Sequence, residues 1–366
     1  MKKICNIFNY PSHYRAKIYK LLDSEYDCKF VFSDEKINIK KMNLDELKNV
    51  RVNHVSQMGH FLWLKGLVPL AFKRFDSYIM TVATNDLSHW LFLIILKMFS
   101  RKKVYVWCHG FYGKENNAQL MVRKMYYGLV DGLFLYGDYA RNLLINHGVK
   151  PEKMFVVHNS LNYDKQLEIR KTIKSSNIYK QHFVNEHPVL VMIGRLNNRK
   201  KLDLLFEAMA ILNKEGSYFN AVIIGDGDYK YSLEKRVQEL DLKEQVWFYG
   251  ACYDEYLNAE LLYNADLCVI PGDVGLSAIH SLMFGVPVIT HNYFPDQGPE
   301  FEVIHMEQTG AFYKAGDIIS LSDTIKNWFS SHSDDREQVR NCCYNVIDTE
   351  WNPYYQMKVF KKVLGQ

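Results

Sequence analysis

Long hydrophobic runs are missing from this sequence. The most apolar stretch, WLFLIILKM at residues 90–98, falls far below the ~20 residues that a helix needs to span a bilayer. The N-terminal segment MKKICNIFNYPSHYR carries two lysines, but Asn and Pro soon interrupt its apolar run. It therefore predicts a first β-strand rather than a signal peptide, and we expect a cytosolic or peripheral protein.

Cysteine is scarce and irregularly spaced. Seven cysteines are scattered over 366 residues, and only Cys342 and Cys343 are adjacent. An odd set without paired spacing excludes a disulfide framework or a zinc ribbon and favours a reducing compartment. Hydrophobic residues nevertheless make up 48% of the chain, enough to bury real cores, and the length suits two domains of similar size.

Acidic residues are under-represented in the first half of the chain. Residues 1–155 contain 24 Lys and Arg against 13 Asp and Glu, a net charge of +11, whereas residues 156–366 contain 21 against 28, a net charge of −7. We infer that the first half faces something anionic. Nucleic acid is one candidate, but no nucleic-acid motif is visible, so a membrane surface or a phosphate-bearing acceptor is favoured.

Strand-like and helix-like segments alternate along the whole sequence, which predicts an α/β protein with two doubly wound, Rossmann-like parallel sheets. The expected strands are 3–8, 28–32, 78–82, 103–108, 132–136, 155–158, 189–193, 221–224, 246–249, 267–270 and 287–290. Residues 161–187 are polar, lack strand character and end before Pro188. They predict a linker between a domain over 1–160 and a second domain that begins at 188.

The segment VLVMIGRLNNRKKLDLLFEAM opens the second domain. Its strand ends at Gly194, and Arg195 and Lys200 follow before a helix. Cations at the carboxyl edge of a parallel sheet can hold a diphosphate, although two solvated loop cations would have the same spacing. Further on, PGDVGL feeds a helix N-terminus, where free N–H groups favour a phosphate.

These strings, in this order, resemble the nucleotide-binding domain of retaining GT-B glycosyltransferases of family 4 (group 1). The matching strings between 189 and 317 are IGRLNNRK, VIIGDGDYKYSLEK, VWFYGACYDE, LLYNADLCVIPG, GLSAIHSLMFGVPVIT and GPEFEVI. The first half is similar more loosely, through NYPSHYRAKIYKLL, VYVWCHG and KMFVVHNSLNYD. The terminal WNPYYQMKVFKKVL resembles the last helix of that family.

The resemblance implies a GT-B architecture of two Rossmann-like domains facing across a cleft. Residues 1–160 would form the acceptor-side domain, and 188–345 the nucleotide-sugar-binding domain. Residues 346–366 would form a helix that crosses back to the first domain.

The resemblance also implies roles for individual residues. Arg195 and Lys200 would bind the donor diphosphate and stabilise the leaving nucleotide, and His109 would reach across the cleft to the donor sugar. The remaining expected donor contacts come from the strand end, the base-pocket loop and the phosphate loop with its helix: Gly194, Cys252, Gly272, Asp273, Val274, Gly275, Leu276 and His280. Transfer would retain the anomeric configuration and would require no resident metal.

Two positions depart from the family pattern, which places a glutamate, seven residues and a second glutamate around the phosphate loop. Gly272 occupies the first position and His280 the second. Asp273 is the nearest substitute for the first carboxylate. A neutral His280 can still accept a hydrogen bond from a ribose hydroxyl, although a half-buried structural histidine is the alternative.

Other candidates have weaker support in the sequence. Glu300 and Glu302 are candidate donor or acceptor contacts, and only Glu300 matches a Pro-Glu position of the family. His13 and Arg15 are either acceptor or sugar contacts or solvated loop residues. The apolar stretch Trp90–Lys103 ends in three cations. It is either an interfacial anchor on anionic lipid or a core helix with a charged end.

The expected function is transfer of a sugar from a nucleotide-diphosphate sugar, with UDP favoured over GDP, to a saccharide acceptor. A lipid-linked acceptor at the inner face of the plasma membrane, in assembly of a capsule or O-antigen type polysaccharide, fits the family and the basic first half. The alternatives are a GT-B enzyme acting on a soluble small molecule, and a nucleotide-sugar-binding accessory subunit that has lost catalysis.

Overall fold

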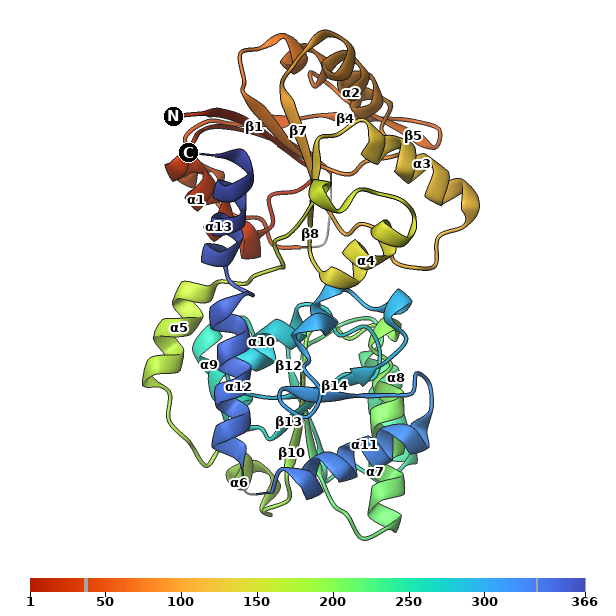
Figure 1. Cartoon of the computed structure of the whole chain (residues 1–366). Coiled ribbons are helices and arrows are strands. Elements are labelled where there is room, and N and C mark those ends of the chain that lie inside the picture. Colours follow the sequence, from red (N-terminus) through yellow and green to blue (C-terminus); the bar gives the residue numbers. More distant parts are fainter. Residues whose placement is uncertain (36–38, 334, 366) are drawn as a thin grey trace. The chain divides into compact units, whose positions relative to one another are not determined.

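A computed structural model describes residues 1–35, 39–333 and 335–365. The chain folds into two compact units, each built on its own parallel sheet (Figure 1). Unit 1 comprises Met1–Asn162 and Asn352–Gln366, and unit 2 comprises Tyr163–Trp351. The C-terminal helix thus packs in unit 1 although the helix before it belongs to unit 2.

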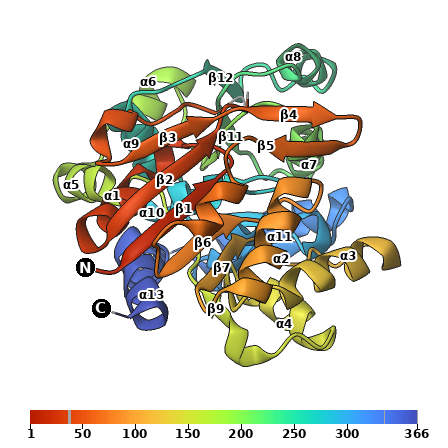
Figure 2. The ribbon, with the colours of Figure 1, turned by 90° about the horizontal axis from the view of Figure 1, so that it is seen from above.

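Unit 1 contains a seven-stranded sheet in the order β3-β2-β1-β6-β7-β8-β9, in which every neighbouring pair is parallel. Figure 2 shows β3, β2, β1 and β6 side by side. The strands are β1 (Lys3–Phe8), β2 (Asp27–Ser33), β3 (Val50–Asn53), β6 (Ser77–Thr81), β7 (Lys103–Cys108), β8 (Gly132–Leu135) and β9 (Met154–Val156), beside a hairpin of β4 (Val55–Met58) and β5 (Phe61–Leu64).

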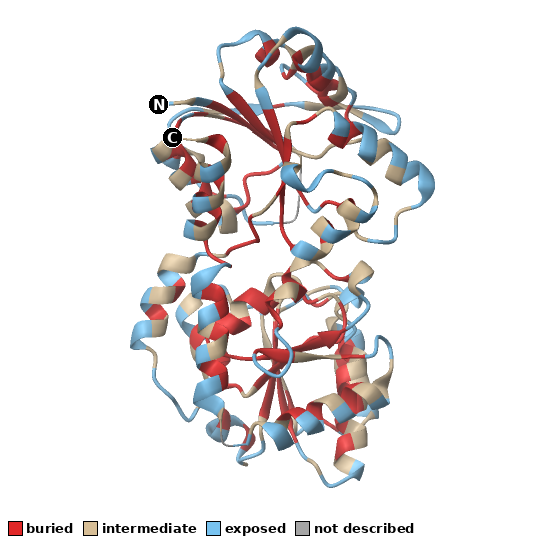
Figure 3. Ribbon diagram, in the orientation of Figure 1, coloured by how far each residue is buried: buried red, intermediate tan, exposed pale blue. Residues whose placement is uncertain are grey.

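Helices cover both faces of this sheet, and the central strands are buried as their unbroken apolar runs predict (Figure 3). On one face α1 (Ala16–Glu25) packs beside α13 (Pro353–Leu364), with Tyr19 and Phe360 fully buried. On the other face lie α2 (Leu87–Phe99), α3 (Asn117–Gly128) and α4 (Asp138–Asn146).

Unit 2 contains a six-stranded parallel sheet in the order β12-β11-β10-β13-β14-β15. Its strands are β10 (Val189–Ile193), β11 (Asn220–Ile224), β12 (Val246–Gly250), β13 (Leu267–Val269), β14 (Val288–His291) and β15 (Gly310–Tyr313). Its helices are α5 (Tyr163–Thr172), α6 (Ile178–Phe183), α7 (Leu202–Lys214), α8 (Lys230–Glu239), α9 (Glu255–Asn264), α10 (Ser277–Met283), α11 (Ile318–Ser331) and α12 (Arg336–Thr349).

The α/β class with two Rossmann-like sheets is confirmed, and each expected strand is found within two residues of its predicted ends. The strands that the sequence did not predict are β3, β4, β5 and β15. They have only four residues each, and β3, β4 and β5 bury little of their surface. β3 and β4 carry no apolar run, and the run FLWL of β5 is short. No helix among the described residues is long and apolar enough to cross a membrane.

Candidate functional site

The first candidate site lies in unit 2, where β10, β13 and their following loops meet. Gly194 directly follows β10 and has a φ of +141°. A Cβ there would lie 3.0 Å from Ser277 Oγ at the start of α10. Arg195 follows and is exposed. Among the described residues its guanidinium has no hydrogen-bond or ion-pair partner, so it is available to an anion.

Lys200 is placed differently from Arg195. Its ammonium donates to the carbonyl oxygens of Asp273 at 2.7 Å and Val274 at 3.0 Å. Burial lowers the pKa of Lys200, partly offset by the nearby Asp273. An ammonium has three donors, and two are used here, so Lys200 both holds the glycine loop in place and leaves one N–H for a ligand.

Gly272 sits where two loops touch. Its N–H donates to Lys200 O at 2.9 Å, and the N–H of Asp273 donates to Arg199 O at 3.0 Å. A Cβ at position 272 would lie 1.9 Å from Arg199 O, a backbone atom that cannot move alone. This backbone therefore admits no side chain at position 272, and a carboxylate is excluded there on steric grounds.

Both carboxylate oxygens of Asp273 have partners within unit 2. Oδ2 accepts from Arg199 Nη2 at 2.6 Å, and Oδ1 accepts from the N–H of Gly298 at 2.9 Å. Glu300 is buried and lies close by. A Cβ built on Gly298 would lie 2.7 Å from Glu300 Oε2 and 3.4 Å from Asp273 Oδ1. Two carboxylates thus lie close to Gly298, beside the glycine loop of residues 271–276.

The start of α10 offers backbone donors. In the described part of the chain, the N–H groups of Gly275 and Leu276 donate to no acceptor, whereas the N–H of Val274 donates to Gln297 Oε1 at 2.9 Å. Gly275 has φ +54°, and a Cβ there would lie 3.8 Å from Lys200 Nζ. Two free amides next to a half-buried ammonium can stabilise a phosphate.

His280 lies one turn along α10 and is half-buried. Its Nε2 lies 2.8 Å from Glu255 Oε1, and Gln166 Nε2 donates to the same oxygen at 2.8 Å. Burial pushes the pKa of Glu255 upward, but His280 and the two hydrogen bonds bring it below its ordinary value. The second oxygen, Oε2, accepts no hydrogen bond from the described residues. A carboxylate oxygen is therefore present beside position 280, although it comes from α9.

Sequence reasoning missed Glu255, because an acidic residue in the first turn of a helix is usual for dipole reasons alone. The loop before it contains Cys252, which is half-buried. Its carbonyl oxygen accepts from Asn258 Nδ2 at 3.3 Å, and its Sγ lies 3.5 Å from Asp254 O. The loop at Cys252 is thus held by contacts with the start of α9.

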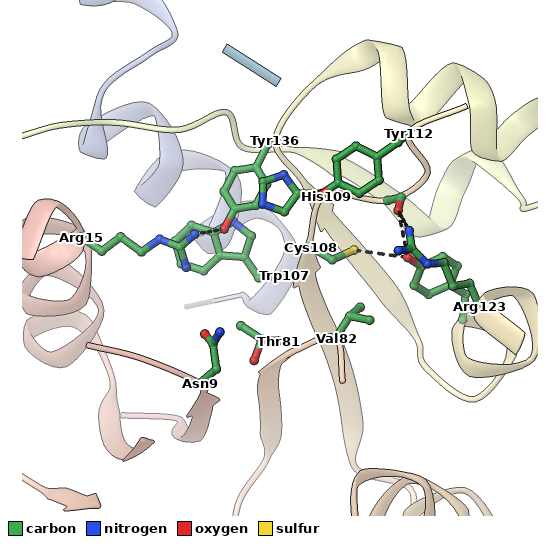
Figure 4. A pocket seen from close by; sticks show the side chains of 12 residues that line it. Asn9, Arg15, Thr81, Val82, Trp107, Cys108, His109, Tyr112, Arg123 and Tyr136 are labelled. Atoms are coloured by element: carbon green, nitrogen blue, oxygen red, sulfur yellow. Dashed lines mark hydrogen bonds between the residues drawn. The ribbon is translucent and has the colours of Figure 1, made fainter. Parts of the chain in front are cut away.

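A second candidate site is a cavity of about 230 Å³ in unit 1, at the carboxyl ends of β1, β6, β7 and β8 (Figure 4). Arg15 donates from Nη2 to Tyr136 Oη, and its guanidinium lies 5.0 Å from the Trp107 ring centroid and 5.3 Å from that of Tyr136. Stacking on aromatic faces holds a guanidinium that no carboxylate neutralises among its described contacts.

His109 projects from the end of β7 into the same cavity. Its ring lies 4.7 Å from the Tyr136 ring and stacks on Tyr112 at 5.7 Å. Arg123 also lines the cavity, but it donates to Gly110 O at 2.8 Å and to Glu115 Oε1 at 3.0 Å. The structure thus brings Arg15 and His109 together. His13 lies outside the lining residues, with Nδ1 3.1 Å from Lys40 O.

An adjoining cavity of about 220 Å³ shares Asn9, Thr81 and Val82 with the first. Glu35 and His89 line it, and neither was a sequence candidate. Burial raises the pKa of Glu35 and lowers the pKa of His89 to about 4. His89 also lies 3.3 Å from Tyr126 Oη and follows the helix cap of Asp86, which accounts for it as a structural residue.

Comparison with known proteins gives the fold of the chain and a family match for part of it. Residues 174–345 match the family described as "Glycosyl transferases group 1". A protein of the Klebsiella pneumoniae cps region is 24% identical over 250 residues, 66% of this chain and 61% of that protein. Alpha-monoglucosyldiacylglycerol synthase of Streptococcus pneumoniae is 29% identical over 170 residues, 44% of this chain and 37% of the synthase.

Among solved structures, Anabaena HepE in complex with UDP superposes with a TM-score of 0.74 at 16% identity, over 100% of both chains. The lipopolysaccharide outer core galactosyltransferase WaaB also gives 0.74, at 14% identity over 99% of both chains. The matched stretches span under two thirds of the curated relatives named above, whereas these structures match end to end. The chain therefore has the GT-B fold, and its residues 174–345 are similar to the glycosyl transferases group 1 family.

Proposed function

We propose that this protein is a retaining glycosyltransferase that transfers a sugar from a UDP-sugar to a saccharide acceptor. The observation that carries the proposal is the arrangement at the start of α10. Among the described residues, the amides of Gly275 and Leu276 and the guanidinium of Arg195 have no partner. These groups and the ammonium of Lys200 occur within the stretch that matches the group 1 family. A departing diphosphate is stabilised by fixed donors and cations of this kind.

In the proposed reaction the bond between the anomeric carbon and the diphosphate oxygen breaks, and the electron pair leaves with UDP. The acceptor hydroxyl oxygen bonds to the anomeric carbon from the same face, and its proton passes to the departing diphosphate. Arg195, Lys200 and the amides of Gly275 and Leu276 stabilise the negative charge that develops. Unit 1 binds the acceptor in the cavity that contains Arg15 and His109.

The finer assignments rest on several observations. UDP is favoured over GDP because HepE was solved with UDP. A lipid-linked acceptor in surface polysaccharide assembly is suggested by the relatives, one from a cps region and one named for diacylglycerol glucosylation. His280 and Glu255 would meet the ribose hydroxyls through the open Glu255 Oε2, because His280 Nε2 already faces Glu255.

Nucleotide release tests the proposal. The purified protein is incubated with a panel of UDP- and GDP-sugars, with and without saccharide acceptors, and release of UDP or GDP is measured together with the anomeric configuration of the product by NMR. We expect UDP release and a retained configuration. Inversion would overturn the retaining assignment. Binding of UDP without any release would instead support the accessory subunit that Gly272 and His280 suggested.

A further inference from the structure

Helix α2 has an apolar ridge that faces away from the protein. Leu87, Leu91, Ile94 and Met98 recur at every turn on one side of the helix and are 39–68% exposed. The opposite side is buried: Phe92, Leu93 and Leu96 are at most 2% exposed, in the core against the sheet. The ridge therefore is not needed to hold α2 on unit 1.

Two phenylalanines extend the ridge at the C-terminal end of α2. Phe99 is 75% exposed, and Phe72, at the end of the 3₁₀ turn Val68–Phe72, is 72% exposed. The two segments are tied together, because Lys102 Nζ donates to Ala71 O at 2.9 Å and also to Lys73 O. We call these six side chains, Leu87, Leu91, Ile94, Met98, Phe99 and Phe72, the α2 ridge.

Cations, but no carboxylates, accompany the α2 ridge. Lys73, Arg74, Lys97 and Arg101 are exposed, and none has a side-chain partner in the described part of the chain. Neither residues 68–74 nor residues 87–103 contain an Asp or Glu. Three acids that border these segments in the sequence or the sheet are engaged elsewhere. Asp86, directly before α2, is buried and caps the helix by accepting from the N–H groups of Ser88 and His89. Asp131 pairs with Lys103 at 2.9 Å, and Asp76 accepts from the N–H of Lys3 at 2.8 Å.

We propose that the α2 ridge and its four cations dock unit 1 on an anionic lipid surface. Apolar side chains flanked by Lys and Arg are what an interfacial helix requires, with the apolar face among the acyl chains and the cations at the headgroups. Pairing with a second copy through this face would bring eight cations together without a carboxylate. The proposal deepens the proposed function, since a docked unit 1 would meet a lipid-linked acceptor.

The structure also identifies which cations to change. Lys102 and Lys103 are structural, because Lys102 holds residues 71–73 and Lys103 is paired with Asp131. Their replacement would confuse lost stability with lost binding. The charge variant is therefore Arg74→Gln/Lys97→Gln/Arg101→Gln, and the apolar variant is Ile94→Ser/Met98→Ser/Phe99→Ser.

Matched controls come from exposed positions of unit 2. Tyr231→Ser/Ile319→Ser removes apolar surface, and Lys171→Gln/Lys214→Gln/Lys243→Gln removes three charges. Co-sedimentation is measured with vesicles of phosphatidylcholine alone and of equal parts phosphatidylcholine and phosphatidylglycerol, at low and high salt. UDP release with a soluble acceptor is measured in parallel, which separates failure of docking from failure of the proposed function.

We expect the wild type to bind the phosphatidylglycerol vesicles, with weaker binding at high salt. A contribution of about 1 kcal/mol per cation corresponds to about fivefold each, so the charge variant should bind tenfold to a hundredfold more weakly. The apolar variant should lose at least tenfold, and both controls should bind as wild type.

Equal binding by variants and controls would overturn the proposal, as would no binding by the wild type. So would a concentration-dependent dimer that only the apolar variant loses, because a second copy would then cover the ridge.

Discussion

The cavity in unit 1 is formed mainly by side chains, whereas the glycine loop of residues 271–276 in unit 2 is formed mainly by backbone. The cavity is formed by side chains: Arg15 and His109 lie among Trp107, Tyr112 and Tyr136. The glycine loop is formed by backbone, where the N–H of Gly272 donates to Lys200 O and, among the described residues, the amides of Gly275 and Leu276 have no acceptor. Aromatic faces can be exchanged for one another, but a backbone contact can tolerate only glycine.

This difference explains why the resemblance is strong in unit 2 and loose in unit 1. Glycines that are sterically required leave a visible spacing in the sequence, and phosphates are common to all nucleotide sugars. A cavity lined by exchangeable side chains, as in unit 1, leaves no fixed string in the sequence. Four further predictions probe this contrast, from the largest expected effect to the smallest.

Gly272→Glu should damage the protein most. The new Cβ would meet Arg199 O at 1.9 Å, so the two loops must separate, at about 4 kcal/mol or more in the free energy of unfolding. Urea unfolding and nucleotide affinity measure the effect. Gly128→Ala is the matched control, because nothing lies within 4 Å of a Cβ at that helical position. If Gly272→Glu were stable and more active, the backbone account of this loop would be wrong.

Arg195→Ala should reduce catalysis while leaving stability unchanged. Loss of a cation that meets only the ligand should lower kcat/KM tenfold to a thousandfold, about 1.4–4 kcal/mol of transition-state stabilisation. Lys200→Ala should lower kcat/KM similarly and also lower the melting temperature, because Lys200 holds the loop carbonyls. Lys214→Ala is an exposed control on α7. Wild-type kcat/KM in Arg195→Ala at subsaturating donor would refute the assignment.

Arg15→Met should weaken the acceptor rather than the donor. Loss of a guanidinium stacked on Trp107 and Tyr136 should cost about 1–2 kcal/mol, seen as a higher KM for an acceptor with an anionic group. The KM for the UDP-sugar should not change. Arg141→Met is the control, because Arg141 is a half-buried arginine on α4 that does not line the cavity. A rise in the KM for the UDP-sugar alone would indicate that Arg15 contacts the donor, and the assignment of Arg15 to the acceptor would be wrong.

Glu255→Gln and His280→Ala should have the smallest effect, about 0.5–1.5 kcal/mol each on nucleotide affinity. The pair also predicts a pH dependence. Since the folded-state pKa of Glu255 lies below its ordinary value of 4.5, its contribution to stability is present above about pH 4.5 and is lost as pH falls through the folded pKa.

Glu255→Gln should therefore flatten the acid limb of a stability–pH profile, measured by thermal unfolding from neutral pH downward. His280→Gln, which keeps one hydrogen-bonding group, should lie between wild type and His280→Ala in nucleotide affinity. Identical affinity for UDP in all four proteins would leave His280 and Glu255 as purely structural residues of unit 2.

The sequence by itself determined the α/β class, the two parallel sheets and most strands, because buried parallel strands require unbroken apolar runs. It also located the Gly194 loop and the PGDVGL loop. Only the tertiary structure showed that Lys200 binds carbonyl oxygens while Arg195 has no partner among the described residues. The carbonyl of Asp273 that Lys200 binds is 73 residues away in the sequence, so local spacing cannot predict the contact. The tertiary structure likewise decided that α9 supplies a carboxylate to His280, and that one side of α2 is exposed. Contacts between segments that are distant in the sequence arise when the elements pack together, so a local sequence pattern cannot predict them.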